Sequence, residues 1–383
     1  MKRKVLIPVL GLFLVLVFVG LGLQFSAGAV TPPPAGQVPL YTYSSFQGLG
    51  GATGPYFQNA ARAVSSDGTT VVGASGDHGF IWKETTGIVL LPEVPLPWAG
   101  SDACAVSEDG TIAAGSVEDV GRPACRWTLD NGEWVLQVLG DLAGGGYGSN
   151  FYAMSSDGKV LTGFVNFASY TEAARWTLTE QGWVIEYLGD LPGGNFNSTA
   201  CGCSVDGSVV VGCGQVGPNI SLTRAFRWTA STGMVDLGVI GKRKWSVAYG
   251  CSSDGSVVVG LTDGDFQRDQ VAFRWTQSRG MVSLGLLPNT LTSAARAVSA
   301  DGTIVVGRCS ARKNVNKAFI WDGANGMRSV QDVLAAHGVS LPKGWSLLEA
   351  YGVATPEPGV VVVVGKGFNS QGYTEAWRAV IGQ

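Results

Sequence analysis

The stretch Ala248-Tyr-Gly-Cys-Ser-Ser-Asp-Gly-Ser-Val-Val-Val-Gly260 decides the fold of this chain. Asp254-Gly255 is a turn signal, because aspartate tolerates unusual backbone angles and glycine adopts a positive φ without a Cβ clash. The β-branched run Val257–Val259 suits a strand that is buried on both faces. The stretch therefore predicts two short strands joined by a tight turn.

The same two-stranded unit recurs along the chain. Further copies occupy Ala61–Gly73, Ala103–Gly115, Tyr152–Gly163, Ala200–Gly212 and Ala295–Gly307, and a degenerate copy ends at Gly365. Each copy continues into a third strand built on Ala-Phe-Arg-Trp or a variant, and then into a fourth strand such as Gly-Met-Val-x-Leu-Gly. Four strands in a repeat of about 50 residues are typical of one blade of a propeller.

The two ends of the chain fit together as one further repeat. The last copy opens at Ala350, passes Trp377 and stops without a fourth strand, whereas Val38–Leu49 is the end of a repeat without its beginning. We therefore predict an all-β, seven-bladed β-propeller over residues 38–383, in which the N-terminal strand closes the last blade. Its repeats start near residues 61, 103, 152, 200, 248, 295 and 350. A β-solenoid is the alternative, but it does not explain the split repeat.

Composition agrees with an all-β body, and the N-terminus indicates export. The 383 residues include 56 glycines and only 14% charged residues, which favours strands and turns over helices or disorder. Residues 1–29 combine a basic start, an apolar run from Val5 to Leu23 and a small-x-small site at Ala27–Ala29, as a secretory signal peptide does. The alternative is an uncleaved anchor, because the run approaches the ~20 residues that span a bilayer. Residues 30–37 form a proline-rich linker.

Charge limits the class of partner. Without the three basic residues of the signal peptide, 23 Lys and Arg stand against 29 Asp and Glu, a net charge of −6. No basic stripe remains, which argues against nucleic acid as a partner. We expect a soluble monomer outside the cytoplasmic membrane, with a glycan or an extracellular protein as its ligand.

The repeat resembles the HAF-type extracellular repeat proteins, a family of secreted bacterial repeats named for a His-Ala-Phe in the motif. The matching residues are Arg224-Ala-Phe226, Val271-Ala-Phe273, Lys317-Ala-Phe319 and His78-Gly-Phe80, with Gly-Met strands at Gly233 and Gly280. This sequence departs from the motif because it nearly lacks the histidine. The resemblance implies an extracytoplasmic setting and brings no established activity with it.

Loop lengths indicate which face of the ring carries a ligand. The turns between strands one and two and between strands three and four keep nearly constant lengths, whereas the other two connections vary. In an up-and-down blade, the two variable connections emerge on the same face, which we call the variable-loop face. Binding loops on a rigid scaffold behave in this way, so we expect the ligand at this face.

One position of the first strand differs from blade to blade. It lies between two small residues, and its occupants are Arg62, Cys104, Tyr152, Cys201, Tyr249, Arg296 and Tyr351. If the first strand is innermost, these side chains form a ring around the axis. We predict Arg62, Tyr152, Tyr249, Arg296 and Tyr351 as ligand-binding residues, because arginine and tyrosine bind anions and sugars. The alternative is that the seven side chains wedge between blades as core.

The remaining polar residues favour binding over catalysis. His78 and His337 are the two histidines and lie in different repeats, which argues against a catalytic triad or a histidine metal site. Asp263-x-Asp265-x-x-x-Asp269 lacks the full spacing of a calcium loop and favours a solvated acidic loop. We therefore predict no catalytic residue, metal or cofactor, and a non-catalytic binding or adhesion propeller. The alternative is a carbohydrate-active hydrolase or lyase with loop-face carboxylates, drawn from Glu118, Asp119, Glu172, Asp265 and Glu375.

The seven cysteines fall into two groups. Cys125, Cys203 and Cys251 occupy positions that other repeats fill with valine or phenylalanine, so we expect them to be small buried apolar residues. Cys201 and Cys213 flank a turn almost symmetrically, so that a disulfide across the hairpin is geometrically possible. The sequence leaves that bond open.

Overall fold

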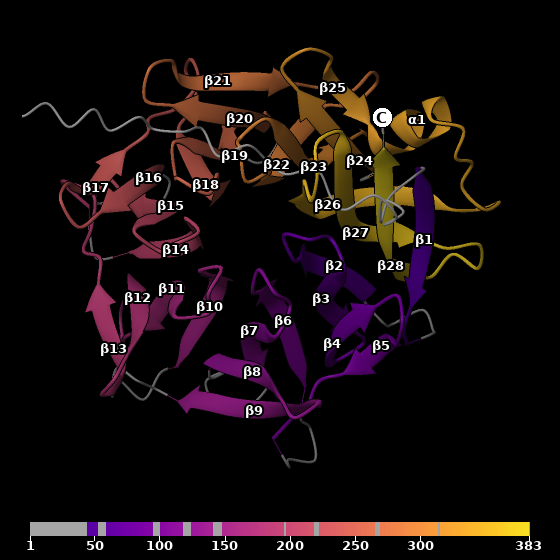
Figure 1. Cartoon of the computed structure of the whole chain (residues 1–383). Coiled ribbons are helices and arrows are strands. Elements are labelled where there is room, and N and C mark those ends of the chain that lie inside the picture. Colours follow the sequence, from indigo (N-terminus) through magenta and orange to yellow (C-terminus); the bar gives the residue numbers. More distant parts are fainter. Residues whose placement is uncertain are drawn as a thin grey trace, which may run out of the picture. The chain divides into compact units, whose positions relative to one another are not determined.

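The computed structural model describes residues 44–52, 59–94, 100–117, 124–140, 148–194, 197–217, 222–264, 269–312 and 315–382. These residues all lie within one compact unit, Tyr41–Gln383. Their 28 strands form seven four-stranded antiparallel sheets, arranged around one axis as the blades of a β-propeller (Figure 1). The prediction of an all-β, seven-bladed propeller is confirmed.

The strands of the first six blades follow one another in sequence. Blade 1 contains β2 (Asn59–Val64), β3 (Thr70–Ser75), β4 (His78–Lys83) and β5 (Gly87–Leu90). Blade 2 contains β6 (Ser101–Val106), β7 (Ile112–Val117), β8 (Ala124–Asp130) and β9 (Glu133–Gly140). Blade 3 contains β10 (Ser149–Met154), β11 (Val160–Asn166), β12 (Thr171–Thr179) and β13 (Gly182–Tyr187).

Blades 4 to 6 repeat this order. Blade 4 contains β14 (Ser198–Cys203), β15 (Val209–Gln215), β16 (Thr223–Thr229) and β17 (Gly233–Asp236). Blade 5 contains β18 (Trp245–Cys251), β19 (Val257–Asp263), β20 (Val271–Thr276) and β21 (Gly280–Gly285). Blade 6 contains β22 (Thr292–Val298), β23 (Ile304–Ser310), β24 (Asn316–Asp322) and β25 (Gly326–Ser329).

Blade 7 joins the two ends of the described chain. It contains β26 (Ser346–Ala354), β27 (Val360–Phe368), β28 (Thr374–Gly382) and β1 (Ser45–Gly50). β1 pairs antiparallel with β28, and Phe46 lies opposite Ala379. The ring of Phe46 lies 5.1 Å from that of Trp345 and 6.5 Å from that of Trp377. The predicted closure of the last blade by the N-terminal strand is therefore confirmed, while residues 38–43 lie outside the described part.

The Ser-x-Asp-Gly sequences form the turns between the first two strands, as predicted. In blade 5 the Ser252 hydroxyl donates to Asp254 at 2.7 Å and accepts the backbone N–H of Val257 at 3.0 Å. Gly255 has φ +65°, which an L side chain rarely adopts. Each turn therefore satisfies its own polar groups, which explains why the same residues recur.

Two sets of hydrogen bonds tie neighbouring blades together at these turns. Backbone bonds of 2.9 Å link Glu108 to Ser156, Ser156 to Val205, Val205 to Ser253 and Ser253 to Ala300. In several blades an arginine of the third strand also donates to the turn carbonyl of the next blade, as Arg227 does to Gly255 at 2.9 Å. In blade 7 the equivalent Arg378 donates to Gly68 of blade 1 at 3.1 Å, which links the last blade to the first.

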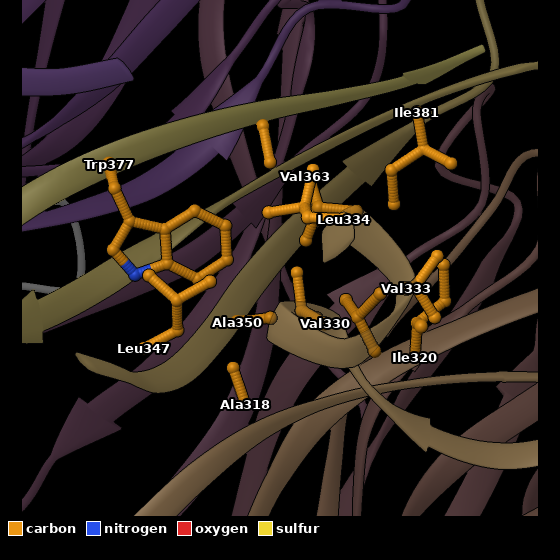
Figure 2. Packing of buried hydrophobic residues seen from close by; sticks show 12 residues of the cluster. Ala318, Ile320, Val330, Val333, Leu334, Leu347, Ala350, Val363, Trp377 and Ile381 are labelled. Carbon is orange, nitrogen blue, oxygen red and sulfur yellow. The ribbon is translucent and has the colours of Figure 1, made fainter. Parts of the chain in front are cut away.

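A short helix, α1 (Val330–Ala336), lies between β25 and β26 and was not expected from the repeat. The Ser329 side chain caps it by accepting the backbone N–H of Asp332 at 3.1 Å. Val330, Val333 and Leu334, at helical spacing, pack in one cluster with Leu347 and Trp377 of blade 7 (Figure 2). The helix therefore fills the core between the last two blades. Its apolar spacing is visible in the sequence, but seven residues are too few for the pattern to stand out.

Candidate functional site

Every first strand contains a β-bulge at the same place. Its pairing with the second strand shifts by one residue in each blade, for example between Ala248 and Gly250 in blade 5. The residue skipped by the pairing is in every blade the variable one. These bulge residues are Arg62, Cys104, Tyr152, Cys201, Tyr249, Arg296 and Tyr351. A bulge leaves the extra residue unpaired and redirects its side chain.

A glycine of the second strand lies opposite each bulge. A Cβ atom on Gly260 would lie 1.9 Å from the carbonyl oxygen of Val247, and the equivalent distances in the other blades are 1.8–2.0 Å. The equivalent glycines are Gly73, Gly115, Gly163, Gly212, Gly307 and Gly365. The bulge therefore exists only where this residue has no side chain. A glycine inside a strand is a known bulge signal, so the sequence contained this feature although it was not predicted.

The seven bulge residues line one cavity of about 450 Å³ on the axis of the ring. Asp102, Thr199 and Cys213 complete its wall. Asp102 and Thr199 lie two residues before a bulge, and Cys213 follows the opposing glycine, so all three lie on the variable-loop side of the bulges. The first strands are therefore innermost, as predicted, and the cavity extends from the bulges toward the variable-loop face.

On the other side of the bulges, small residues allow the first strands of neighbouring blades to approach each other closely. A Cβ atom on Gly202 would lie 3.1 Å from Cα of Gly250, and one on Gly352 would lie 3.3 Å from Cα of Ala63. Neighbouring first strands therefore touch where the sequence has Ala or Gly. Tyr152 is 42% exposed, so at least this bulge residue faces open space and does not serve as core between blades.

The most buried charge at the axis is Glu349, whose side chain is 4% exposed. Its carboxylate lies 2.7 Å from Nε of Arg296, 3.3 Å from Nε of Arg308 and 3.9 Å from Nζ of Lys366. The hydroxyl of Tyr351 donates to its other oxygen at 2.8 Å. Arg308, Glu349 and Lys366 were missed, because they interrupt the repeat in blades 6 and 7 only. The available signal was a glutamate at a position where the other blades have no acid except Asp102.

These contacts set the protonation states of the cluster. Burial alone would raise the pKa of Glu349, but Arg296 and Arg308 lower it below its usual value. Burial raises the pKa of Tyr351, and the neighbouring Glu349 raises it further. Burial also lowers the pKa of Lys366, in addition to the effect of the nearby arginines. Glu349 is therefore ionised at neutral pH, and Tyr351 keeps the proton that it donates.

The other predicted binding residues contact this cluster or one another. Arg62 binds Asp102 at 3.2 Å, and its guanidinium lies 5.2 Å from the centre of the Tyr351 ring. The Arg296 guanidinium lies 4.7 Å from the centre of the Tyr249 ring. All five predicted residues are thus brought to one cavity. That they bind a ligand stays a prediction.

All seven cysteines are free thiols in the structure. The bulge makes Cys201 the unpaired residue and places Cys213 opposite Thr199, so the symmetric pairing assumed for a disulfide is shifted. Both line the cavity with Cys104, whose pKa is raised by burial to about 12. Cys125 is fully buried, and Cys203 and Cys251 pack against apolar clusters, as expected.

Two of the five candidate carboxylates, Glu172 and Glu375, are within the described residues. Glu118, Asp119 and Asp265 are outside the described residues. Glu375 accepts hydrogen bonds from the Gly50 N–H at 3.0 Å and from Asn369 at 2.9 Å, so it helps to hold β1. Burial and then Asp190 raise the pKa of Glu172. Neither Glu172 nor Glu375 lines the axial cavity.

The predicted acidic loop is only partly solvated. Asp269 is exposed and binds Arg243 at 2.7 Å. Asp263 is fully buried at the end of β19, and neither of its carboxylate oxygens has a hydrogen-bond partner among the described residues. The expectation of a solvated loop is therefore wrong for Asp263. In the described ranges, no three His, Cys, Asp or Glu side chains converge as ligands of a metal ion would.

The positions of the two histidines and the extent of the described chain bear on the predictions about a histidine site and a signal peptide. His78 opens β4 and lies 2.9 Å from Glu93, whereas His337 caps α1, so the two belong to different blades. Residues 1–43, with the predicted signal peptide and linker, are outside the described part. Within that part, no helix has the length and apolar character needed to cross a membrane.

Comparisons with known proteins bear on the fold alone. No family model and no curated protein matches this chain. Among solved structures, an oligogalacturonate lyase from Vibrio parahaemolyticus is similar, with 13% identity, 88% of this chain and 97% of that chain covered, and a TM-score of 0.54. A prolyl endopeptidase is similar over 85% of this chain and 50% of that chain, with 14% identity and a TM-score of 0.51. Both likenesses support the propeller architecture.

Proposed function

We propose that this chain is an exported, non-catalytic binding propeller that takes up part of a glycan or protein ligand in its axial cavity from the variable-loop face. The observation that carries the proposal is the set of seven bulges. One backbone device, repeated in every blade, presents seven side chains of different chemistry to one cavity. A scaffold that keeps its backbone constant and varies the side chains at a cavity is organised as a binding site.

The cavity offers groups for recognising a polar ligand. Arg62 is a charged donor whose side chain is 36% exposed, and Tyr152 presents the most exposed aromatic ring of the bulge residues. The Tyr249 and Tyr351 rings are covered by Arg296 and Arg62, which holds those guanidiniums in place. The volume of about 450 Å³ is of the size that accommodates a small molecule or the end of a chain.

Charge states favour binding over hydrolysis. Acid–base hydrolysis of a glycosidic bond needs one carboxyl group that keeps its proton and another that does not. Glu349 and Asp102 are the carboxylates of the described cavity region, and both are held in ion pairs with arginine. The pKa of Glu349 lies below its usual value, so it is poorly suited to donate a proton. Among the described residues, a hydrolase or lyase would have to use carboxylates that do not line this cavity.

A setting outside the cytoplasmic membrane is part of the same proposal. It is supported by the basic, apolar and small-residue pattern of residues 1–29 and by the resemblance to extracellular repeats. N-terminal sequencing of protein secreted by an exporting host should return a start at or near Val30. A start at Met1 would favour the anchor alternative.

A glycan array probed with the chain from Val30 onward tests the binding proposal. We expect a ligand whose affinity falls by about 1–3 kcal/mol in Tyr152→Ala and in Arg62→Gln. Lys159→Ser, on the exposed turn of blade 3, is the control and should bind as the unchanged protein does. Melting curves of all variants exclude unfolding as the cause. A ligand lost in Lys159→Ser but retained in the two cavity variants would contradict the proposed face.

A further inference from the structure

The wall of the axial cavity is divided into two halves of different chemistry. The charged half comes from blades 6, 7 and 1, with Asp102 of blade 2 at its border. Its cavity-lining residues are Arg62, Asp102, Arg296 and Tyr351. Glu349 binds Arg296 and Tyr351 and connects them to Arg308 and Lys366; Glu349, Arg308 and Lys366 do not themselves line the cavity. The thiol half comes from blades 2 to 4 and consists of Cys104, Tyr152, Thr199, Cys201 and Cys213. Tyr249 of blade 5 lies between them. Because the blades follow chain order around the ring, the halves face each other (Figure 1).

The charged half has more positive than negative groups. The lining residues Arg62 and Arg296 stand against Asp102, a surplus of one positive charge. With Arg308, Lys366 and Glu349, the groups connected to them, the surplus is two when all are ionised. The Nε atom of Arg62, a residue that lines the cavity, is buried and has no hydrogen-bond partner among the described residues, whereas Nε of Arg308 lies 3.3 Å from the Glu349 carboxylate. A buried charged donor without a partner is costly, and an anion would satisfy it.

Glu349 holds this half in place. Its carboxylate contacts three cations and the Tyr351 hydroxyl at once, so it orients groups contributed by β22, β23, β26 and β27. Being 4% exposed, it is nearly inaccessible to a ligand itself. Glu349 is therefore a positioning residue, and Arg296, which lines the cavity and is 23% exposed, is the cation beside it that can meet an anion.

The thiol half is poor in hydrogen-bonding groups. Three cysteines line it, and a thiol is a weak donor and a weak acceptor. The Tyr152 ring, 42% exposed, lies 5.8 Å from the ring of Phe164 and presents an aromatic surface. Apart from the hydroxyls of Tyr152 and Thr199, a sugar ring placed here would find few strong hydrogen-bond partners among the described residues, whereas an apolar or aromatic group needs none.

We propose that the cavity recognises an amphiphilic organic anion, with an anionic group such as a carboxylate at the charged half and an apolar or aromatic body against the thiol half. This inference rests on the proposed binding function and concerns the part of the ligand that enters the axial cavity. A neutral glycan would leave the positive surplus without a counter-charge, and a hydrophilic anion would leave the thiol half unused. A ligand with both features matches both walls.

Titration calorimetry with four probes tests the inference. The probes are 2-naphthoate, its neutral counterpart 2-naphthalenemethanol, glucuronate and its neutral counterpart glucose. We expect 2-naphthoate to bind at least tenfold more tightly than each of the others, because it alone combines the anionic group with an aromatic body. This ranking is measured on the unchanged protein and does not depend on any variant folding.

Two matched pairs of variants place the probe in the cavity. Arg62→Gln should weaken 2-naphthoate about tenfold, whereas Arg243→Gln, which also removes an arginine paired with one aspartate, should not. Tyr152→Ser should weaken it several-fold, whereas Tyr187→Ser should not. Tyr187 is a fair control because it lies in the same blade and is 39% exposed, against 42% for Tyr152.

The outcomes separate this inference from the binding function on which it rests. The amphiphile assignment is overturned if glucuronate binds as tightly as 2-naphthoate, or if glucose binds more tightly than either anion. The proposal that the cavity binds a ligand would then still stand. Naphthoate binding that survives both cavity variants would place the probe elsewhere and also overturn it. Failure of all four probes, for a protein that binds an array ligand, would reject the inference alone. Failure of both the probes and the array would contradict the binding function too.

Discussion

Two sets of seven residues face each other across the blades, the glycines of the second strands and the bulge residues of the first. The glycines are identical because a Cβ atom would meet a carbonyl oxygen within about 2 Å. The bulge residues comprise two arginines, three tyrosines and two cysteines, although the backbone around them is the same. The glycines thus repeat because the backbone requires them. The bulge residues vary because the fold does not determine which side chain stands there.

Exposure gives the physical reason for the difference. Gly260 faces protein atoms on the neighbouring strand, so any side chain there must displace backbone. Tyr152 faces the cavity and is 42% exposed, so other side chains of similar size can replace it without a clash. The cavity residues are therefore available for recognition. The contrast between required and replaceable positions can be tested by substitution and truncation.

We expect the largest loss of stability when the ring of blades is opened, because both the second-strand glycines and the bulge residues depend on it. Removing residues 30–50 deletes β1, exposes β28 as an edge and removes the contacts of Phe46 with Trp345 and Trp377. We expect the free energy of unfolding to fall by about 5 kcal/mol, with aggregation. Removing only residues 30–37, the proline-rich linker, should leave the melting midpoint unchanged. Equal midpoints for the two truncations would contradict closure by β1.

A methyl group at a required glycine should have the next largest effect. Gly260→Ala places a Cβ atom 1.9 Å from the Val247 carbonyl oxygen, so the bulge must be rebuilt. We expect a loss of about 2–4 kcal/mol in urea unfolding. Gly323→Ala is the control, because a Cβ atom on Gly323 would have no neighbouring atom within 4 Å. It should be neutral or slightly stabilising. Similar losses for both variants would remove the steric explanation.

Glu349→Gln tests a buried charge at the axis that the repeat does not require. The change leaves Arg296, Arg308 and Lys366 without their shared carboxylate, and we expect a loss of about 3 kcal/mol at pH 7. Asp269→Asn, which breaks an exposed pair with Arg243, should cost under about 1 kcal/mol. Urea unfolding measures both. An equally small loss for Glu349→Gln would show that the cluster is not held by this carboxylate.

The repeated turn aspartates should give a smaller effect that depends on pH. The Ser252 hydroxyl and the Ser256 backbone and side chain lower the pKa of Asp254 from 3.8 to about 2. Because the folded pKa is the lower one, this stabilisation is present above about pH 4 and is lost as the pH falls toward 2. In Asp254→Asn the free energy of unfolding should be lower at pH 7 by under about 1 kcal/mol, and the two proteins should converge near pH 2. A gap that widens on acidification would reverse the sign and contradict the prediction.

The smallest loss of stability is expected at a replaceable position. Tyr152→Ala should cost under about 1 kcal/mol, because the side chain is already 42% exposed. The preceding residue provides the contrast. Phe151 is 2% exposed and lies 4.4 Å from the ring of Trp176, so Phe151→Ala should cost about 3–5 kcal/mol. Thermal unfolding of the pair decides the point, and comparable losses would mean that Tyr152 is core.

Sequence alone determined whatever repeats or is local. The Ser-x-Asp-Gly turns, the third-strand Ala-Phe-Arg-Trp and the split repeat at the two ends predicted the seven blades and their closure. The ring of variable residues, from Arg62 to Tyr351, was also visible, because a periodic chain shows where the period is broken. These features need only short-range stereochemistry and counting.

The tertiary structure decided what depends on exact register and on contacts between blades. The bulge moves Cys213 opposite Thr199, a shift of one residue that the symmetry of the hairpin did not reveal. The contacts of Glu349 with Arg296 and Arg308 join residues from different blades. Such pairs are not periodic and lie about 50 residues apart in the chain or less, so only the packing of one blade against the next brings them together. The charged half of the cavity exists for that reason, and with it the proposed preference for an amphiphilic anion.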